Sequence, residues 1–315
     1  MLISVILVSY NTAAMTCQAI ETLLQSKCSF DLQLIVIDNA SRDNSIQMIQ
    51  QAFPQITLIE NKTNVGFGRA NNQAIPLLKG DYVLLLNTDA FVAPDTLEKT
   101  VAFMQTHPDV GILGVKLVGR NGDLQPSCRY FPTVLNLFLQ RAGLDRRFPD
   151  VKYVDDMDWD HATPRLCDWV PGCYYLIRKE VIEQVGLFDP RYFLYNEEVD
   201  HCKTAKNAGW QVMFFPETEV VHIGGESAKS DGAISQVSRQ LVALQVESEL
   251  LYFRKHYGLL SVMTHLLLQI MADFILMLKS LVRLKPISVY SQYMQHVYLF
   301  CKFACATYLG KHPTK

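Results

Sequence analysis

The sequence predicts an α/β fold with a mostly parallel central sheet, followed by a region of C-terminal helices. Short apolar runs alternate with helix-spaced segments over the first hundred residues, and a polar cluster follows each of the first four runs. After about residue 238 the composition changes to long, apolar, helix-compatible stretches. Alternation of this kind is typical of βαβ units, in which helices cover both faces of a parallel sheet.

The expected elements follow one another in a regular order at first. Apolar runs that predict strands lie at 2–8, 34–37, 56–59 and 82–86. Helical spacing predicts helices at 14–24 and 44–53, after Gly66 and after Pro94. From 110 to 171 turn residues weaken the pattern, which predicts a long insertion over one edge of the sheet. Order returns with an apolar run at 170–178, helices near 179–185 and 199–208, and a strand at 212–215.

The bulk properties exclude several classes of protein. With 315 residues and 49% hydrophobic composition, the chain is long enough for a large core. The net charge of -2 means that no overall basic balance points to nucleic acid. The eight cysteines contain no C-x-x-C pair, which is typical of reduced thiols in the cytoplasm. The first residues lack a basic region and a cleavage site, so they predict a strand and not a signal peptide.

The polar clusters predict one ligand crevice. The first four apolar runs end in Ser9-Tyr10-Asn11, Asp38-Asn39, 61–64 and Asn87-Thr88-Asp89. In an open α/β sheet, ligands bind outside the carboxyl ends of the strands, where these clusters would meet. We therefore expect residues from all four clusters to line one binding site.

The ligand's phosphates need a device other than a glycine-rich loop. The turn after the first strand contains no glycine, which excludes a G-x-G-x-x-G dinucleotide site, and no Walker motif is present. Asp89 follows a buried strand, where a carboxylate is unfavourable unless it is paired or bound to metal. Mg²⁺ or Mn²⁺ would bridge such a carboxylate to phosphates. The alternative is that Asp89 caps the helix beginning near Pro94.

Asp38 and His222 each have two interpretations. Asp38 is a candidate to accept a hydrogen bond from a pyrimidine N–H. Alternatively, it only stabilises the turn before a helix that Ser41 and Asp43 cap. His222 precedes Gly224-Gly225, where an imidazole could ligate the cation and glycine N–H groups could approach phosphate. A lone histidine after a strand is otherwise a structural residue.

A second acidic group lies at Glu197, Glu198 and Asp200. Carboxylates at a helix N-terminus are expected on dipole grounds alone. That explanation does not account for the apolar, aromatic segment at 192–195 directly before them. A carboxylate in such surroundings has a raised pKa and can act as a general base.

Taken in order, these segments resemble the inverting family 2 glycosyltransferases, in particular the rhamnosyltransferase-like branch. The resemblance runs from about residue 2 to 258. It rests on the motifs at 8–11, 36–41, 64–72, 86–89, 125–129, 193–200 and 222–227. It implies a GT-A (Rossmann-like) fold, a nucleoside diphosphate sugar donor and Mg²⁺ or Mn²⁺.

The resemblance also assigns roles to residues. Asp89 matches the last acidic position of the D-x-D motif, with Asn87 in place of its first Asp, and the metal ligands would be Asp89 and His222. Glu198 lies at the position of the catalytic base, where relatives usually have Asp, and Glu197 is the alternative. The donor-binding residues would be Ser9, Tyr10, Asn11, Asp38, Asn64, Gly66, Arg69, Asn72, Asn87, Thr88, Asp89, Gly172 and Ser227.

The implied reaction is transfer of a sugar, L-rhamnose from dTDP-rhamnose by resemblance, to a glycan or lipid-linked glycan in cell-surface polysaccharide synthesis. Residues 1–237 would form the catalytic domain, with a nucleotide-sugar half at about 1–115 and an acceptor half at 116–237. The alternatives are a non-catalytic nucleotide-sugar-binding protein and a nucleotidyltransferase. No nucleic acid partner is expected.

Residues 238–315 predict a membrane-associating region. The apolar stretch 259–282 carries one polar stripe, because Ser261, His265, Gln269 and Asp273 recur every four residues. A lipid-facing spanning helix would not tolerate Asp273 near its centre, whereas an interfacial helix would. Basic residues flank the stretch, which suits anionic headgroups, and a second apolar stretch follows at 289–309. We expect a peripheral enzyme on the inner face of the cell membrane; the alternative is a helical hairpin packed on the catalytic domain or, in a homodimer, on a second subunit.

Overall fold

The computed structural model describes residues 1–224 and 234–314, with side chains left out for 234–239. The chain divides into two compact units. The first, called the sheet unit here, comprises Met1–Arg129, Met157–Pro190 and Glu197–Val237. The second, called the helical unit, comprises Tyr130–Asp156, Arg191–Asn196 and Ser238–Lys315. Two segments inside the expected catalytic domain, 130–156 and 191–196, thus cluster with the C-terminal helices.

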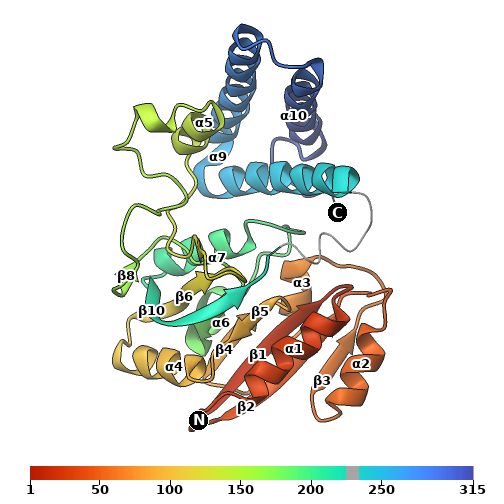
Figure 1. The fold of residues 1–315 in the computed structure, drawn as a ribbon, viewed down its shortest axis with the longest axis vertical. Helices are drawn as coiled ribbons and strands as arrows, with labels where there is room; N and C mark the ends of the chain where they lie inside the picture. The colour runs from red at the N-terminus through yellow and green to blue at the C-terminus, as the bar shows by residue number, and fades with distance from the viewer. Residues whose placement is uncertain (225–233, 315) are drawn as a thin grey trace. The chain divides into compact units, whose positions relative to one another are not determined.

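The sheet unit is built on one mixed sheet (Figure 1). Its strands are β1 (Leu2–Ser9), β2 (Asp31–Asp38), β3 (Thr57–Glu60), β4 (Tyr82–Leu86), β5 (Ala90–Val92), β6 (Val110–Val118), β7 (Leu124–Gln125), β8 (Arg165–Leu166), β9 (Tyr174–Arg178) and β10 (Gln211–His222). The main path runs β3-β2-β1-β4-β9-β6-β10-β5, with β7 beside β6 and β8 beside β10. The first four strands on this path pair in parallel, and so do β6 and β10, whereas β9 and β5 pair antiparallel to their neighbours.

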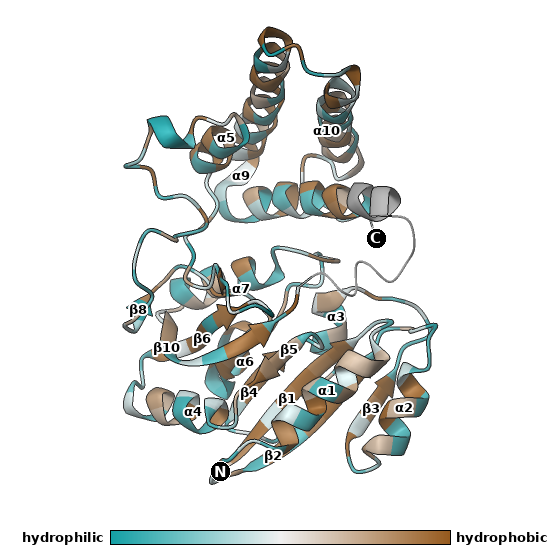
Figure 2. Cartoon of the chain, in the orientation of Figure 1, coloured by the Kyte–Doolittle hydropathy of each residue, from teal (hydrophilic) through white to brown (hydrophobic). Residues whose placement is uncertain are grey.

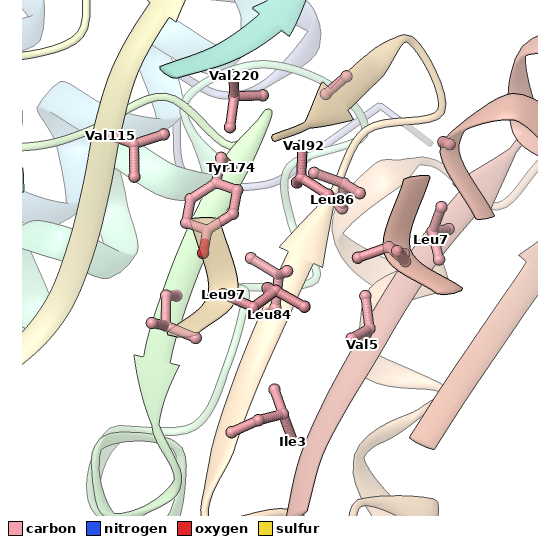
Figure 3. Close-up of a cluster of buried hydrophobic side chains, with 14 of the residues drawn as sticks. Ile3, Val5, Leu7, Leu84, Leu86, Val92, Leu97, Val115, Tyr174 and Val220 are labelled. Carbon is pink, nitrogen blue, oxygen red and sulfur yellow. The ribbon is translucent and has the colours of Figure 1, made fainter. Parts of the chain in front are cut away.

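Helices cover both faces of this sheet. Those of the sheet unit are α1 (Ala13–Leu24), α2 (Ser45–Ala52), α3 (Phe67–Asn72), the short 3₁₀ helix η1 (Ile75–Leu77), α4 (Thr96–Thr106), α6 (Lys179–Val185) and α7 (Glu197–Asn207). Alternate strand residues such as Val5, Leu84 and Tyr174 meet Leu97 of α4 in one apolar core (Figure 3). Because strand side chains alternate between faces, the remaining strand residues form the opposite face, where α6 packs on β9 and α7 on β10.

The expectation of an irregular insertion from 110 to 171 is wrong at its start. Residues 110–118 form β6, which lies in the interior of the sheet between β9 and β10. At position 114 the strand needs a glycine, because a Cβ there would come within 2.6 Å of the Val170 side chain. The turn residues that predicted the insertion, Gly119, Asn121, Gly122 and Pro126, all follow β6, whereas Gly114 inside the strand permits close packing.

The helical unit contains α5 (Val134–Arg141), the 3₁₀ helix η2 (Asp145–Arg147), α9 (Ile234–Val282) and α10 (Ile287–Ala306). Thr133 and Asn136 form a capping box at the start of α5. Helix α9 is broken at Gly258, whose φ of 80° is left-handed, so its two parts run in different directions (Figure 1). The second part of α9 and α10 form the expected pair of apolar helices.

Candidate active site

The carboxyl ends of β1 and β2 carry the first two polar clusters, and the backbone there is strained. Asn11 and Ala40 both adopt positive φ, 54° and 68°, although neither is glycine. Such conformations cost about 1–3 kcal/mol each and concentrate at functional sites. Contacts across the two loops hold them together, since Asn11 N donates to Ser41 Oγ at 2.9 Å and Arg42 N donates to Asn11 Oδ1 at 2.7 Å.

Asp38 ends β2 as a completely buried carboxylate. Its Oδ1 accepts a hydrogen bond from Ser41 N at 2.8 Å, so one oxygen does serve the turn. Its Oδ2 is buried and has no hydrogen-bond partner among the described residues. A buried carboxylate oxygen without a donor is unfavourable by itself, so this atom fits a ligand N–H.

Asn39 joins the second and third clusters. Its Nδ2 donates to Asn64 Oδ1 at 2.9 Å, and its Oδ1 accepts from Asn61 Nδ2 at 3.1 Å and from Val65 N at 3.0 Å. Asn64 Oδ1 also accepts from Gly66 N at 2.9 Å. Gly66 starts α3 with a φ of 90°, which a side chain would resist. The asparagines thus fix the loop that leads into α3.

The fourth cluster places Asp89 beside His222. Strand β5 pairs antiparallel with β10 so that His222 lies opposite Ala90, and the His222 Nε2 atom is 3.6 Å from Asp89 Oδ1. The other carboxylate oxygen of Asp89 accepts from Gly224 N at 3.1 Å. The helix after Pro94 begins at Thr96, directly after Asp95, so the capping alternative for Asp89 is wrong.

Gln125 holds the His222 ring in a defined orientation. The amide Nε2 of Gln125 donates to the His222 carbonyl oxygen at 2.8 Å, and its Oε1 lies 2.9 Å from His222 Nδ1. Because Oε1 is an acceptor, Nδ1 carries the proton and the Nε2 lone pair faces Asp89. Burial lowers the pKa of His222, with the Asp89 charge opposing that effect, so the ring is held towards its neutral form.

Asp89 and His222 together fit a divalent cation. A lone pair and a carboxylate oxygen that face each other repel unless a proton or a cation lies between them. Two protein ligands are enough when diphosphate oxygens and water complete the coordination shell. Among the described residues no group of three or more His, Cys, Asp or Glu side chains is arranged to hold a metal.

The two glutamates at the start of α7 differ in their surroundings. Glu197 is buried, its Oε2 has no partner in the described part of the chain, and burial followed by the charge of Glu198 raises its pKa far above the usual range. Burial also raises the pKa of Glu198, but its own backbone N–H, the Arg129 charge and the Gly172 N–H oppose this effect. The surroundings therefore favour the ionised form of Glu198 more than the ionised form of Glu197.

Cys173 connects the base and metal positions. Burial raises the pKa of its thiol to about 12, and the charges of Asp89 and Glu198 both add to that shift. Its carbonyl oxygen accepts from Asn87 N at 3.1 Å, next to Asp89. Since Cys173 contacts Asn87 and the preceding Gly172 N–H hydrogen-bonds Glu198, Asp89 and Glu198 lie around one region of the sheet unit.

Several residues predicted to bind the donor make hydrogen bonds within the protein. The Ser9 hydroxyl lies 3.1 Å from Thr16 Oγ1, and Thr88 Oγ1 lies 3.2 Å from Thr12 Oγ1. The Asn72 side chain binds the backbone N–H and carbonyl of Phe188.

Three further residues, Arg69, Tyr10 and Ser227, were also predicted to bind the donor. Arg69 Nε donates to Pro190 O at 2.7 Å, and Tyr10 is half-buried beside Asn11 in the chain. Ser227 lies outside the described residues. Donor contacts of all these residues stay predictions.

Residues without an assigned role also contribute to the site. Gln125 orients His222, Arg129 acts on the charge of Glu198, and Asn39 organises the loops. Arg129 also stacks over the Trp169 ring at 4.6 Å. Gln125 and Arg129 both lie in the matched motif at 125–129, which was the available signal, but their partners are distant in sequence.

Two models of known families match the chain. The model described as "Glycosyl transferase family 2" matches residues 4–155, and "Glycosyl transferase family group 2" matches residues 82–309. An N-acetylglucosaminyl-diphospho-decaprenol L-rhamnosyltransferase of Mycobacterium tuberculosis is 28% identical over 215 residues, covering 64% of this chain and 70% of the relative. An uncharacterized glycosyltransferase of Haemophilus influenzae is 36% identical over 110 residues, covering 34% and 44%.

Solved structures resemble the fold. TarS 1–349 of S. aureus has a TM-score of 0.53 at 15% identity, covering 98% of this chain and 92% of that one. The mannosyltransferase PcManGT from Pyrobaculum calidifontis, solved in complex with GDP-Man and Mn²⁺, has a TM-score of 0.56 at 15% identity, covering 98% and 88%.

Together with the mixed sheet and the polar site at its strand ends, these neighbours show that the chain has the GT-A fold. Because the second family model covers well over half of its residues, the chain belongs to glycosyl transferase family group 2 and is a glycosyltransferase.

Proposed function

We propose that this glycosyltransferase moves a sugar, with inversion, from a nucleoside diphosphate to a hydroxyl of a glycan or lipid-linked glycan. The observation that carries the proposal is the segment 172–173, whose Cys173 carbonyl oxygen accepts from Asn87 N at 3.1 Å, two residues from Asp89, while the Gly172 N–H hydrogen-bonds Glu198. A metal-binding carboxylate and a base-type carboxylate around one region are what a single displacement needs.

Each end of the donor has a candidate partner on the chain. The free Oδ2 of Asp38 would accept the N–H of a pyrimidine base. Asp89 and His222 would hold Mg²⁺ or Mn²⁺ together with the diphosphate. When bound, the cation stabilises the negative charge that develops on the leaving diphosphate. In this proposal residues 1–115 bind the nucleotide sugar and 116–237 carry the base and bind the acceptor.

Glu198 would remove the proton from the attacking hydroxyl. The Gly172 N–H and the Arg129 charge favour its ionised form, whereas the effect of burial on Glu197 is reinforced by the charge of Glu198 and opposed by Glu197's own backbone N–H. Glu197 would therefore be harder to ionise than Glu198 and would compete less for the proton. This difference favours Glu198 over Glu197 as the base.

We propose L-rhamnose from dTDP-rhamnose as the donor, supported by the printed activity of the Mycobacterium tuberculosis relative. That relative's name also specifies a lipid-linked substrate. This supports a peripheral enzyme that attaches to the cytoplasmic side of the membrane through residues 238–315.

The test is a donor panel. Purified protein is incubated with dTDP-rhamnose, UDP-sugars or GDP-sugars, a lipid-linked glycan acceptor and Mn²⁺, and released nucleotide and product anomer are measured. We expect nucleoside diphosphate release, an inverted product and loss of both with EDTA or in Asp89→Ala. Turnover unaffected by EDTA would exclude the metal role, and pyrophosphate release would indicate a nucleotidyltransferase instead.

A further inference from the structure

The second part of α9 has its polar residues inside and its apolar residues outside. His265, Gln269 and Asp273 of the polar stripe are buried within the helical unit. Large apolar side chains on other faces of the same helix are exposed, among them Leu260, Leu267, Phe274 and Leu278. A surface helix of a water-soluble protein has the opposite arrangement.

Specific partners hold the polar residues inside. Asp273 Oδ1 accepts hydrogen bonds from Arg141 of α5, at 3.0 Å from Nε and 2.5 Å from Nη2, and its Oδ2 lies 2.6 Å from His296 Nδ1 of α10. His265 Nε2 lies 3.1 Å from Glu249 Oε2 on the first part of α9. These contacts fix the rotation of the helix, so the exposure of its apolar side follows from the packing.

The turn between α9 and α10 is the most exposed part of this apolar surface. All eight residues from 281 to 288 are exposed, and Val282, Leu284 and Ile287 are 85%, 89% and 87% exposed. The two basic residues Arg283 and Lys285 alternate with them. Figure 2 shows the hydrophobic residues of both helices near this turn. Turns in water are usually polar, so a turn with these side chains needs an apolar partner.

We propose that this turn and the adjoining exposed face of α9 insert into an anionic lipid bilayer. The inference rests on the proposed membrane location and names the inserting surface. Leu284 and its aliphatic neighbours would enter the acyl boundary, while Arg283 and Lys285 contact lipid phosphates. From 259 to 306 the only acidic residue is Asp273, which is buried and paired with Arg141. The charged residues exposed on this surface are therefore all basic.

The charge and the packing favour a bilayer over other partners. A second copy of the same face would bring like charges together, whereas anionic headgroups complement them. By length and composition the helix Gln240–Val282 could cross a membrane. However, Gly258 breaks it, and Asp273 in its second part binds Arg141 on α5, a helix followed by the exposed, charged residues Arg146 and Arg147. The second part of α9 therefore lies along the surface of the bilayer.

The experiment is flotation of the full-length protein on vesicles of phosphatidylcholine alone or with 30% phosphatidylglycerol. We expect binding to the anionic vesicles, and a fall of about tenfold or more in the partition coefficient for Leu284→Asp or Ile287→Asp. Charge reversal in Lys285→Glu should weaken binding to anionic vesicles by roughly fivefold or more and leave binding to neutral vesicles almost unchanged. The matched control is Leu24→Asp, an exposed leucine of α1 in the sheet unit, which should float like wild type.

Light scattering and an enzyme assay separate the outcomes. If wild type does not float on anionic vesicles, or if Leu284→Asp floats equally well, the proposal is wrong. A wild-type dimer that Leu284→Asp converts to a monomer, without flotation of either, would assign the face to a second copy. Transfer to a water-soluble acceptor should be equal in wild type and Leu284→Asp, so failure of the proposed reaction would be detected separately.

Discussion

Replacement of Glu198 by Gln tests the chemical step most directly. Glutamine keeps the shape of the side chain and can still accept from the Gly172 N–H, but it cannot take a proton. Loss of a general base lowers the rate by about 10²–10⁴-fold, or roughly 3–5 kcal/mol of transition-state stabilisation. We expect this loss in kcat at saturating donor, with the affinity for donor almost unchanged because Glu198 is not assigned to donor binding.

The pH dependence of activity gives a second, independent test of Glu198 as the base. Burial raises the pKa of Glu198 above its ordinary value of 4.5, and the base must be ionised to act. Activity should therefore fall as pH drops through this raised pKa, so the acid limb lies above pH 4.5. Because the Arg129 charge lowers that pKa, Arg129→Gln should move the acid limb to higher pH.

The control is Glu197→Gln. Since burial and the charge of Glu198 raise the pKa of Glu197 well above its usual range, they already disfavour its ionised form, and the substitution should change kcat little. Protein stability provides a further check. Because the pKa of Glu198 is higher in the folded than in the unfolded state, the stability present at low pH is lost as pH rises through the folded-state pKa. Glu198→Gln should therefore be at least as stable as wild type at pH 7. A larger loss of kcat in Glu197→Gln would refute the assignment of the two glutamates.

Three other substitutions follow from the contacts. Gln125→Leu frees the His222 ring and should weaken Mn²⁺ binding in the presence of nucleoside diphosphate by about 10–100-fold, measured by electron paramagnetic resonance; unchanged binding would contradict its orienting role. Asp38→Ala should weaken dTDP binding by about tenfold in calorimetry, and an equal loss for GDP would argue against base recognition. Asp273→Asn should lower the free energy of unfolding by about 3–5 kcal/mol in urea, whereas the double variant Asp273→Leu, Arg141→Met should recover most of it.

Much of the sheet unit could be predicted from local pattern. The strands near 2–8, 34–37, 56–59 and 82–86 were visible because each is a short apolar run followed by turn residues and then a helix. Strand β6 was missed because the turn residues directly after it, Gly119 to Gly122, dominated the pattern, although its own glycines pack against Val170 and Trp210. The antiparallel insertion of β9 beside β4 depends on pairing between residues about ninety positions apart, which no local pattern contains.

The candidate site could be proposed from its carboxylates, whose roles stay predictions, but their partners could not be predicted. Asp38, Asp89 and Glu198 could be found because an acid after an apolar segment is unfavourable without a role. The partners Gln125, Arg129 and Cys173 come from other parts of the chain, and only the folded structure brings them to His222, Glu198 and Asp89. The difference between Glu197 and Glu198 also depends on burial and neighbouring N–H groups, which residue type does not reveal.

The C-terminal helices illustrate a limit of periodicity as a predictor. A stripe of polar residues every four positions indicates that a helix has two different faces, but it does not say which face meets the protein. In α9 the answer depends on distant partners: Arg141 and His296 bind Asp273, and Glu249 binds His265. Once these pairs form, exposing the polar stripe would leave Arg141 and Glu249 without their partners, so the apolar face must be the one exposed. The polar contacts inside the helical unit thus determine which surface is left for a bilayer.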